Sequence, residues 1–513
     1  PDSQTYHLSR VAHWAQDHSV GIYATGIERQ NFMSPYAEFA VLNLYVLQGG
    51  DTFVNIPNFL VYLGILLGVS WIAAQLGASN RGQWIAAVFA AVIPMAISQG
   101  SSTATDLVTA FWLVCLTAEL LIILEELSRG TQTGLSSWIP VGGALGLATL
   151  TKPTGVIFAI PVVFWAGIRV SQSRKLKLPS VIGAVMILIG CVGLVNLGYF
   201  SRNIGAYGNP LGPAEAVSYQ ANAVFTPGVL LSNTLRNLSL HLGSIGSLDH
   251  FLTTTIERLD GWMGVDPNDP RTTLSQPFQV KGPRNEDNIG NLVPLGVILL
   301  TIVLLLTKRQ VDRRVSGLIL CLVIGYLLFS MLNKWQLFGS RLQTPFFVLF
   351  APMVGYLASM ERFQRWSFPL GAFLLVTGLP WAFFLFQRPI IPIPGITYRS
   401  SILVTPRQEL YYTNSGLPDE YANIAHQIGS AECSQVGLML TGDYPEYLLW
   451  VALKPYANQG MRIEWQVAGT PSARFAPADF SPCALIVNDR PAVAELDGLP
   501  LVFQGQDLQL YLR

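Results

Sequence analysis

The sequence predicts an α-helical polytopic membrane protein with about ten spans, followed by an α/β domain outside the membrane. Hydrophobic residues make up 51% of the chain and charged residues only 12%, whereas a typical soluble domain is about 25% charged. The hydrophobic residues fall in long blocks, and a helix of about 20 apolar residues is what crosses the hydrocarbon core of a bilayer. After residue 390 these blocks stop, and shorter strand-like and helix-like segments begin.

Ten apolar segments account for most of the chain before that point. They cover residues 54–77, 84–98, 107–124, 138–150, 155–168, 180–200, 289–306, 315–332, 342–358 and 368–386. The fourth and fifth segments are short for a span, so they form either two separate spans or one re-entrant pair. Either arrangement leaves the orientation of the later segments unchanged.

Lysine and arginine are concentrated in alternate short loops, which sets the expected orientation, because cytoplasmic loops carry an excess of these residues. The loops that qualify contain Arg81; Arg129; Arg169, Arg174, Lys175 and Lys177; Lys308, Arg309, Arg313 and Arg314; and Arg362 and Arg365. The opposite short loops hold only Lys152, Lys334 and Arg341. We therefore expect a multi-pass protein of the cell (cytoplasmic) membrane, with both ends of the chain outside the cytoplasm.

Two domains follow from this organisation. Residues 1–390 are predicted to form the transmembrane domain, with long outer loops at 1–53 and 201–288. Residues 391–513 are predicted to form the extracytoplasmic α/β domain. The chain begins at Pro1 rather than at a methionine, and we expect an upstream segment such as a first membrane span.

An amphipathic segment precedes the first predicted span. Apolar residues recur at helical spacing at Leu8, Val11, Ala12 and Ala15, which predicts a helix over residues 4–16 that lies at the membrane interface. Asp2 or Ser3 is placed to cap the start of this helix.

The C-terminal region predicts a helix over residues 420–428 and strands over 436–440, 484–487 and 499–511. Cys433 and Cys483 each stand just before a predicted strand, so they would form a disulfide if the strands are neighbours in an oxidising compartment. The other three cysteines lie inside apolar blocks, where packing explains them, and no cysteine spacing is typical of a zinc site. The acids Asp443 and Glu446 follow a predicted strand, and strand ends are a common place for a binding site.

Ionisable residues gather at the outer ends of the predicted spans rather than inside them. Glu119 is the single acid well inside a span, and local pairing explains it better than a proton relay. Each outer residue has an ordinary explanation, as a helix cap or as a cation that reaches the headgroups. Together they place two carboxylates and three cations on the face where cations are disfavoured: Asp2, Asp106, Lys152, Arg202 and Arg341. This set indicates an anionic ligand, with phosphate the obvious candidate.

Such a set fits the transfer of a sugar from a lipid phosphate. A carboxylate can take the proton of an acceptor hydroxyl, and lysine or arginine can stabilise charge on the departing phosphate. Alternatively, the carboxylate pair could hold a divalent cation such as Mg or Mn through oxygen ligands. The formal net charge is zero, so no basic field suggests a nucleic-acid partner.

Three motifs resemble the GT-C superfamily of membrane glycosyltransferases, and glycosyltransferase family 39 most of all, the branch with protein O-mannosyltransferases and lipid A aminoarabinose transferases. The motifs are Asp2-Ser-Gln-Thr-Tyr-His-Leu-Ser-Arg10 before the interfacial helix, Thr105-Asp106-Leu-Val-Thr-Ala-Phe-Trp112 at a span start, and Ala148-Thr-Leu-Thr-Lys-Pro-Thr-Gly155 in a turn. The resemblance covers roughly residues 1–390. The order and sidedness of the three motifs are more specific than any one of them.

The resemblance implies a role for each outer residue. Asp2 takes the place of the family's first-loop catalytic acid and Asp106 that of the second-loop acid. Lys152, Arg202 and Arg341 would bind the donor phosphate. The chain departs from the family in having Ser3 where many relatives have Glu, which removes one metal ligand, and in the Pro153-Thr154 pair within the turn.

The outer loops offer further candidates for an acceptor or a metal ion, namely Glu286, Asp287 and His7. The clusters 266–271 and 284–288 contain many turn-forming residues, so plain loop structure is the competing interpretation.

Three functions are compatible with these observations. The first is a glycosyltransferase that moves a sugar from a polyprenyl-phosphate donor to a hydroxyl of a glycan, lipid or protein acceptor at the outer face. The second is a transporter or lipid flippase, for which intramembrane charges and broken helices in related halves are expected. The third is a membrane scaffold, which leaves the outer-face charges unexplained.

Overall fold

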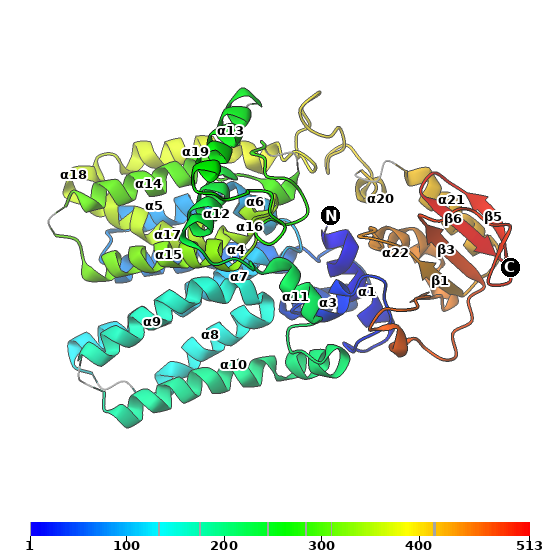
Figure 1. The fold of residues 1–513 in the computed structure, drawn as a ribbon, viewed down its shortest axis with the longest axis horizontal. Helices are drawn as coiled ribbons and strands as arrows, with labels where there is room; N and C mark the ends of the chain where they lie inside the picture. Colours follow the sequence, from blue (N-terminus) through cyan, green and yellow to red (C-terminus); the bar gives the residue numbers. More distant parts are fainter. Residues whose placement is uncertain are drawn as a thin grey trace. The chain divides into compact units, whose positions relative to one another are not determined.

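The computed structural model describes residues 2–131, 134–173, 176–243, 246–282, 285–308, 310–413 and 417–513. The chain forms two compact units. The globular unit contains Pro1–Val54, Tyr199–Ala214 and Gln387–Arg513, and the helical unit contains Asn55–Gly198 and Glu215–Phe386. Figure 1 shows the long helices of the second unit and the sheet of the first.

Every predicted apolar segment falls on a helix. The helices concerned are α4 (Ile56–Gln75), α5 (Asn80–Ala91), α6 (Pro94–Gly100), α7 (Asp106–Arg129), α8 (Trp138–Thr151), α9 (Val156–Ser173), α10 (Leu178–Tyr207), α14 (Leu292–Leu306), α15 (Arg313–Leu332), α17 (Thr344–Ser359) and α19 (Ser367–Phe383). Short helices α16 (Gly339–Leu342) and α18 (Glu361–Gln364) flank α17.

The expected count of about ten spans is not confirmed. Among the described residues, 6 helices are long and apolar enough to cross a membrane, or up to 7 if the bent pair α5 and α6 is one span. Three more helices are apolar but shorter: Leu135–Thr151, Thr344–Ser359 and Ser367–Phe383. The break with a 69° bend lies between α5 and α6, in the second predicted segment rather than between the fourth and fifth.

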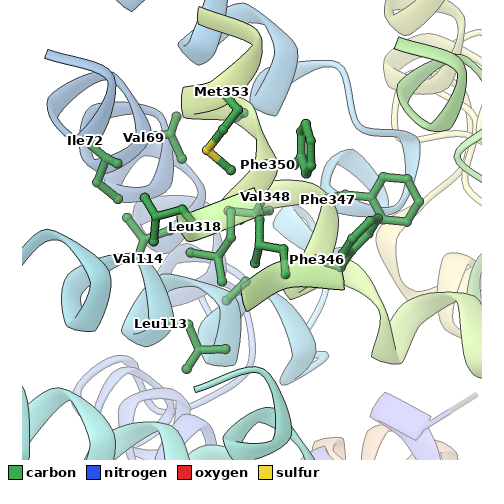
Figure 2. Packing of buried hydrophobic residues seen from close by; sticks show 14 of the residues in the cluster. Val69, Ile72, Leu113, Val114, Leu318, Phe346, Phe347, Val348, Phe350 and Met353 are labelled. Atoms are coloured by element: carbon green, nitrogen blue, oxygen red, sulfur yellow. The ribbon is translucent and has the colours of Figure 1, made fainter. Parts of the chain in front are cut away.

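The core of the helical unit is built around α17. Phe347, Val348 and Phe350 of this helix are fully buried, and Figure 2 shows them among residues of α4, α7 and α15. Gly82 of α5 and Gly355 of α17 let the two backbones meet, because a Cβ on either glycine would overlap the other helix. In contrast, only 6% of the apolar window of α10 is buried inside the structure, as expected for a helix that faces lipid.

The predicted basic loops share one end of the helical unit, which we call the basic end. Ser79 N donates to Ser359 Oγ at 2.9 Å, and Arg314 pairs with Glu125 at 3.3 Å. These contacts join the loops that carry Arg81, Arg129, Arg314 and Arg362. Arg174, Lys175 and Arg309 lie outside the described residues. The opposite end, where α7, α14 and α17 begin, is called the site end.

The predicted outer loop 201–288 is largely helical. It contains the end of α10 together with α11 (Ala214–Gln220), α12 (Pro227–Ser239), α13 (Gly246–Trp262) and the short η4 (Glu286–Asn288). Within cluster 266–271, Asp266 Oδ1 accepts from Asn268 N and Asp269 Oδ1 accepts from Arg271 N, each at 2.8 Å. The hydrogen bonds from Arg271 hold the pKa of Asp269 below its ordinary value. These acids therefore stabilise turns, as the plain-loop interpretation expects.

The globular unit contains a six-stranded mixed sheet. Its strands are β1 (Gln435–Met439), β2 (Arg462–Trp465), β3 (Ala484–Asn488), β4 (Glu495–Leu496), β5 (Leu499–Gln504) and β6 (Leu508–Leu512), in the order β2-β1-β3-β6-β5-β4. The first three strands in this order are parallel, and the others pair antiparallel. Two helices accompany the sheet, α21 (Pro418–Ser430) and α22 (Tyr447–Leu453).

The α/β prediction is confirmed, with two refinements. The run 499–511 forms a hairpin of β5 and β6 rather than one strand, and neither β2 nor α22 was expected. Cys433 and Cys483 form the predicted disulfide, with their Cα atoms 5.7 Å apart. The bond joins the starts of β1 and β3, which are neighbours with Val436 opposite Ala484.

The N-terminal helix is not an interfacial helix. It starts as η1 (Ser3–His7) and continues as α1 (Leu8–Gln16), and both its apolar stripe and its polar face are buried in the globular unit. The stripe packs against α3 (Tyr36–Gln48) and α22, through contacts such as Val41 and Tyr447. Residues 1–53, predicted as part of the transmembrane domain, belong instead to the globular unit together with the C-terminal region.

One buried carboxylate, Glu446, holds these distant segments together. It accepts hydrogen bonds from His13 Nε2 at 2.8 Å, Gln30 Nε2 at 2.6 Å, Trp450 Nε1 at 3.0 Å and Trp465 Nε1 at 3.2 Å. All of Glu446 is shielded from solvent. A buried charge is tolerated only when it is paired and hydrogen-bonded, so Glu446 is a structural centre rather than a binding residue at a strand end.

The pair makes the stability of the globular unit depend on pH. Burial opposes the charged form of both groups, but Glu446 raises the pKa of His13 above 6.5, and His13 with the other donors lowers the pKa of Glu446 below 4.5. The contribution of Glu446 is lost as pH falls through its lowered pKa, and that of His13 is lost as pH rises through its raised pKa. Both are fully present between about pH 4.5 and 6.5.

We predict that the unfolding temperature of the purified full-length protein is highest in this pH window and falls on both sides. In His13→Gln, which keeps a donor for Glu446 but has no titrating group, the decline above the window should disappear. Thermal unfolding followed by tryptophan fluorescence from pH 4 to 9 measures this. His426→Gln, on an exposed face of α21, is the matched control and should behave as wild type. A decline that persists unchanged in His13→Gln would contradict the assignment.

Candidate functional site

Asp106 and Lys152 form an ion pair at the site end of the helical unit. Asp106 is the first residue of α7 and is buried, and Lys152 Nζ lies 2.5 Å from its Oδ1. The Lys152 side chain remains 21% exposed, so it contacts both the carboxylate and the solvent side. The helix N-terminus favours an anion at Asp106. Two of the predicted site residues are thus brought together by the fold.

The turn between α8 and α9 places Lys152 opposite Asp106. Lys152 has an extended backbone, with φ −164° and ψ 111°, which ends α8 before Pro153 begins the short η3 (Pro153–Gly155). Gly155 packs directly on α7, because a Cβ at this position would overlap Thr109 Cγ2. The Pro153-Thr154 pair, a departure from the family pattern, therefore forms the helical turn that carries Gly155 to α7.

Arg341 and Asp287 form a second ion pair in the helical unit, at 3.1 Å, with each side chain about one-fifth exposed. Arg341 lies on α16, and Asp287 lies beside Glu286 in η4. Asn285 fixes η4 with a capping box, since its side chain accepts from the backbone N–H groups of Asp287 and Asn288. Arg284, the start of the predicted cluster 284–288, lies outside the described residues.

The remaining predicted residues lie in the globular unit. Asp2 occupies the N-cap position, but its side chain makes no capping bond. Its Oδ2 accepts from Tyr6 OH at 3.3 Å. The Arg29 guanidinium lies 5.0 Å from the centre of the Tyr6 ring and pairs with Asp443 at 2.5 Å. The C-terminal region thus contributes to the surroundings of Asp2 through Asp443.

His7 and Arg202 have protein partners within the same unit. His7 Nδ1 lies 2.7 Å from the buried carboxylate of Glu38, which Arg10 approaches at 3.3 Å. Arg10 holds the pKa of Glu38 below its ordinary value, against the effect of burial. Arg202 donates to the backbone carbonyl of Val20. His7 is therefore a structural partner of Glu38. No motif in the sequence marks Glu38, which lies in the mostly apolar helix α3.

The candidate residues do not form a ready-made metal site. In the part of the chain that the structure describes, no three His, Cys, Asp or Glu side chains are grouped as metal ligands. Asp106, Asp287 and His7 each have a charged partner in Lys152, Arg341 and Glu38. A divalent cation at these three residues would have to displace their charged partners.

A buried polar network at the site end was missed by the sequence analysis. His241 Nδ1 accepts from the backbone N–H of Asn291 at 3.2 Å, so Nε2 carries the proton and donates to Gln343 Oε1 at 2.8 Å. Tyr326 OH donates to the same oxygen at 2.8 Å. Burial lowers the pKa of His241 to about 4, which keeps the ring neutral at pH 7. The members of this network are far apart in the chain. His241 follows α12, Asn291 precedes α14, Gln343 stands between α16 and α17, and Tyr326 lies in α15, so only the fold brings them together.

We predict that Gly155→Ala destabilises the protein by about 1–3 kcal/mol, the usual cost of forcing an extra carbon into a packed site. Thr109→Ser removes the methyl group that the new Cβ would meet and keeps the hydroxyl that donates to Thr105 O. The double variant Gly155→Ala/Thr109→Ser should therefore recover most of the loss. Chemical denaturation of the three variants measures this, and a double variant no more stable than Gly155→Ala alone would show that the contact is not the cause.

Comparison with known proteins identifies the fold. No family model matches the sequence, and no curated protein is significantly similar to it. The crystal structure of ArnT from Cupriavidus metallidurans bound to undecaprenyl phosphate superposes with a TM-score of 0.57 at 12% identity, over 99% of this chain and 93% of ArnT. The apo form of the same protein gives 0.51, with the same identity and coverage. The chain therefore has the fold of ArnT, in agreement with the resemblance that the sequence motifs carry.

Proposed function

We propose that the protein is a membrane glycosyltransferase that transfers a sugar from a polyprenyl-phosphate carrier to a hydroxyl acceptor at the outer face of the membrane. The observation that carries this proposal is the Asp106–Lys152 pair, which stands at the end opposite the basic loops in a fold shared with ArnT. The ArnT structure contains undecaprenyl phosphate, which supports a donor of this chemical class. Under the positive-inside rule the basic end is cytoplasmic, so the site end faces outward.

The charges can support such a transfer. The acceptor oxygen forms a bond to the anomeric carbon of the sugar, and the bond from that carbon to the phosphate oxygen breaks, so the carrier phosphate leaves with the electron pair. Lys152 and Arg341 would stabilise the negative charge on that phosphate. Both already balance a carboxylate, so a phosphate would share or take over the cation from Asp106 or Asp287.

Asp2 is the proposed acceptor of the hydroxyl proton. A carboxylate is a weak base, and it serves here because the proton moves as the acceptor oxygen bonds to an electron-poor carbon. The Tyr6 hydroxyl that donates to Asp2 Oδ2 orients the carboxylate.

One observation favours a second function, a transporter or lipid flippase. The 69° break between α5 and α6 is a feature that many transporters use to build a substrate site. Transporters of this kind usually have a second broken helix in a related half of the chain. Among the described helices, α5 and α6 form the one bent pair, so no second broken helix is found there. The enzyme is therefore the better-supported proposal, and the assay below distinguishes the two.

The assay measures transfer or hydrolysis of labelled sugars from a panel of polyprenyl-phosphate hexoses and pentoses by the purified full-length protein. We expect wild-type turnover with at least one donor, and a fall in kcat of about a hundredfold or more in Asp2→Asn and in Asp106→Asn. Lys152→Met should lower kcat/KM for the donor by a similar factor, because the leaving phosphate loses its cation. Asp269→Asn, in a turn of the outer loop, is the control and should keep wild-type activity.

Each alternative outcome has a definite meaning. If the folded wild-type protein is inert with every donor, the enzyme proposal fails, and lipid movement in vesicles becomes the measurement for a flippase. If the Asp and Lys variants are as active as wild type, the reaction class stands but the site assignment fails. Treatment with EDTA followed by Mg or Mn tests the predicted divalent cation, and loss and recovery of activity would show that a metal is required.

A further inference from the structure

Three buried polar side chains at the site end carry hydrogen-bonding atoms that have no partner within the described part of the chain. Gln99 in α6 lacks partners for both Oε1 and Nε2, Asn291 for Nδ2, and Ser340 in α16 for Oγ. Gln99 is 3% exposed, and the other two residues are 0% exposed. Nearly all buried polar atoms in proteins are paired, so such a group requires an explanation.

These residues stand on elements that pack against one another. The short η4 contacts both α6 and α16, and its Asp287 pairs with Arg341, the neighbour of Ser340. The backbone N–H of Met95 in α6 donates to Asn291 Oδ1 at 3.2 Å. Gln99 lies four residues, or about one helical turn, after Met95. The three residues therefore stand on or next to elements that meet at η4.

The orientation of Asn291 is fixed rather than assumed. The Oδ1 atom of Asn291 accepts a hydrogen bond from Met95 N, so Nδ2 is the atom without a partner. A flip of the amide, which exchanges Oδ1 and Nδ2, would break the bond to Met95. The adjacent polar groups are satisfied, since His241, Tyr326 and Gln343 are linked to one another and to the Asn291 backbone. Two further buried oxygens without a hydrogen-bond partner among the described residues, Asn222 Oδ1 and Ser232 Oγ, lie in the segment that packs on the end of α15, apart from α6, η4 and α16.

The chemistry of the unpaired atoms restricts what could satisfy them. The two amide NH2 groups offer up to four N–H donors, the Gln99 carbonyl oxygen is an acceptor, and the serine hydroxyl can donate or accept. A phosphate dianion accepts but does not donate, and a metal ion cannot bind an amide N–H, so each would leave part of the set unpaired. Sugar hydroxyls both donate and accept, and they are neutral.

We infer that Gln99, Asn291 and Ser340 bind the hydroxyl groups of a glycosyl ring, as a sugar-recognition subsite. This inference rests on the proposed function and extends it, because it names residues that would select the sugar rather than the phosphate. The sugar ring of the donor and the sugar ring of a glycan acceptor carry the same kind of hydroxyl groups, so either ring could occupy this subsite. The atoms are sealed from solvent in this structure, so binding requires η4 or α16 to move aside.

The test compares wild type with Gln99→Met, which keeps the side-chain length and removes both unpaired atoms. Transfer is measured with the active polyprenyl-phosphate sugar while donor and then acceptor are titrated. Gln75→Met is the matched control, because Gln75 also has an unpaired buried oxygen but lies at the basic-end terminus of α4. We expect KM for the sugar-bearing substrate to rise about tenfold in Gln99→Met, as for loss of one or two hydrogen bonds, and to stay unchanged in Gln75→Met.

The two titrations identify the source of the ring. A rise in KM for the donor alone places the donor sugar in the subsite, and a rise for a saccharide acceptor alone places the acceptor there. Ser340→Ala, a smaller change, takes the place of Gln99→Met if the latter does not fold, and it should raise the same KM. If the variants are active with unchanged KM for both substrates and altered only in unfolding temperature, the unpaired atoms hold ordered water only and the inference is overturned. An inert wild type would instead overturn the proposed function, and this inference with it.

Discussion

The globular unit depends on the burial of one carboxylate. Glu446 receives hydrogen bonds from two tryptophans, one glutamine and one histidine, and the histidine and glutamine lie more than 400 residues before it in the chain. Removing any one partner would leave a buried charge short of compensation, which is far more costly than the loss of a surface ion pair. The N-terminal segment is therefore part of the same folded body as the C-terminal sheet, and Asp2, at the start of that segment, is positioned by this body.

The contacts of Glu446 also illustrate which features of the fold cannot be predicted from the sequence. Apolar runs such as 107–124 and 342–358 predict helices correctly because twenty apolar residues have few other stable forms in a membrane protein. The disulfide is likewise predictable, because Cys433 and Cys483 precede strand-like runs that need a neighbour. In contrast, His7 and His13 look like the polar face of an interfacial helix, since their partners Glu38 and Glu446 are identifiable only after the chain has folded. Span number is a further limit, because length and composition alone do not separate a short buried helix such as α8 from a true span.

The candidate site likewise combines residues that the sequence predicts with a contact that only the structure reveals. Asp106 and Lys152 were predicted separately, and each had an ordinary explanation as a cap or as a cation near the headgroups. The structure replaces both explanations by one contact of 2.5 Å, made possible by the absence of a side chain at Gly155. The second pair, Arg341 with Asp287, follows the same plan of one cation already balanced by one acid. Such pairs keep the cations in place at low cost when no ligand is present, and they can exchange one anionic partner for another.

The two kinds of polar group at the site end have different physical consequences. A paired charge is stable in the empty protein, and a ligand must compete for it, which favours a strongly anionic group such as a phosphate. An unpaired buried amide is unstable in the empty protein, and a neutral ligand with both donors and acceptors relieves it without competition. A substrate that consists of a phosphate and a sugar presents both chemistries within one molecule. The charged pairs and the unpaired amides of the helical unit, taken together, therefore match a glycosylated lipid phosphate better than either set matches a simple anion or a simple sugar.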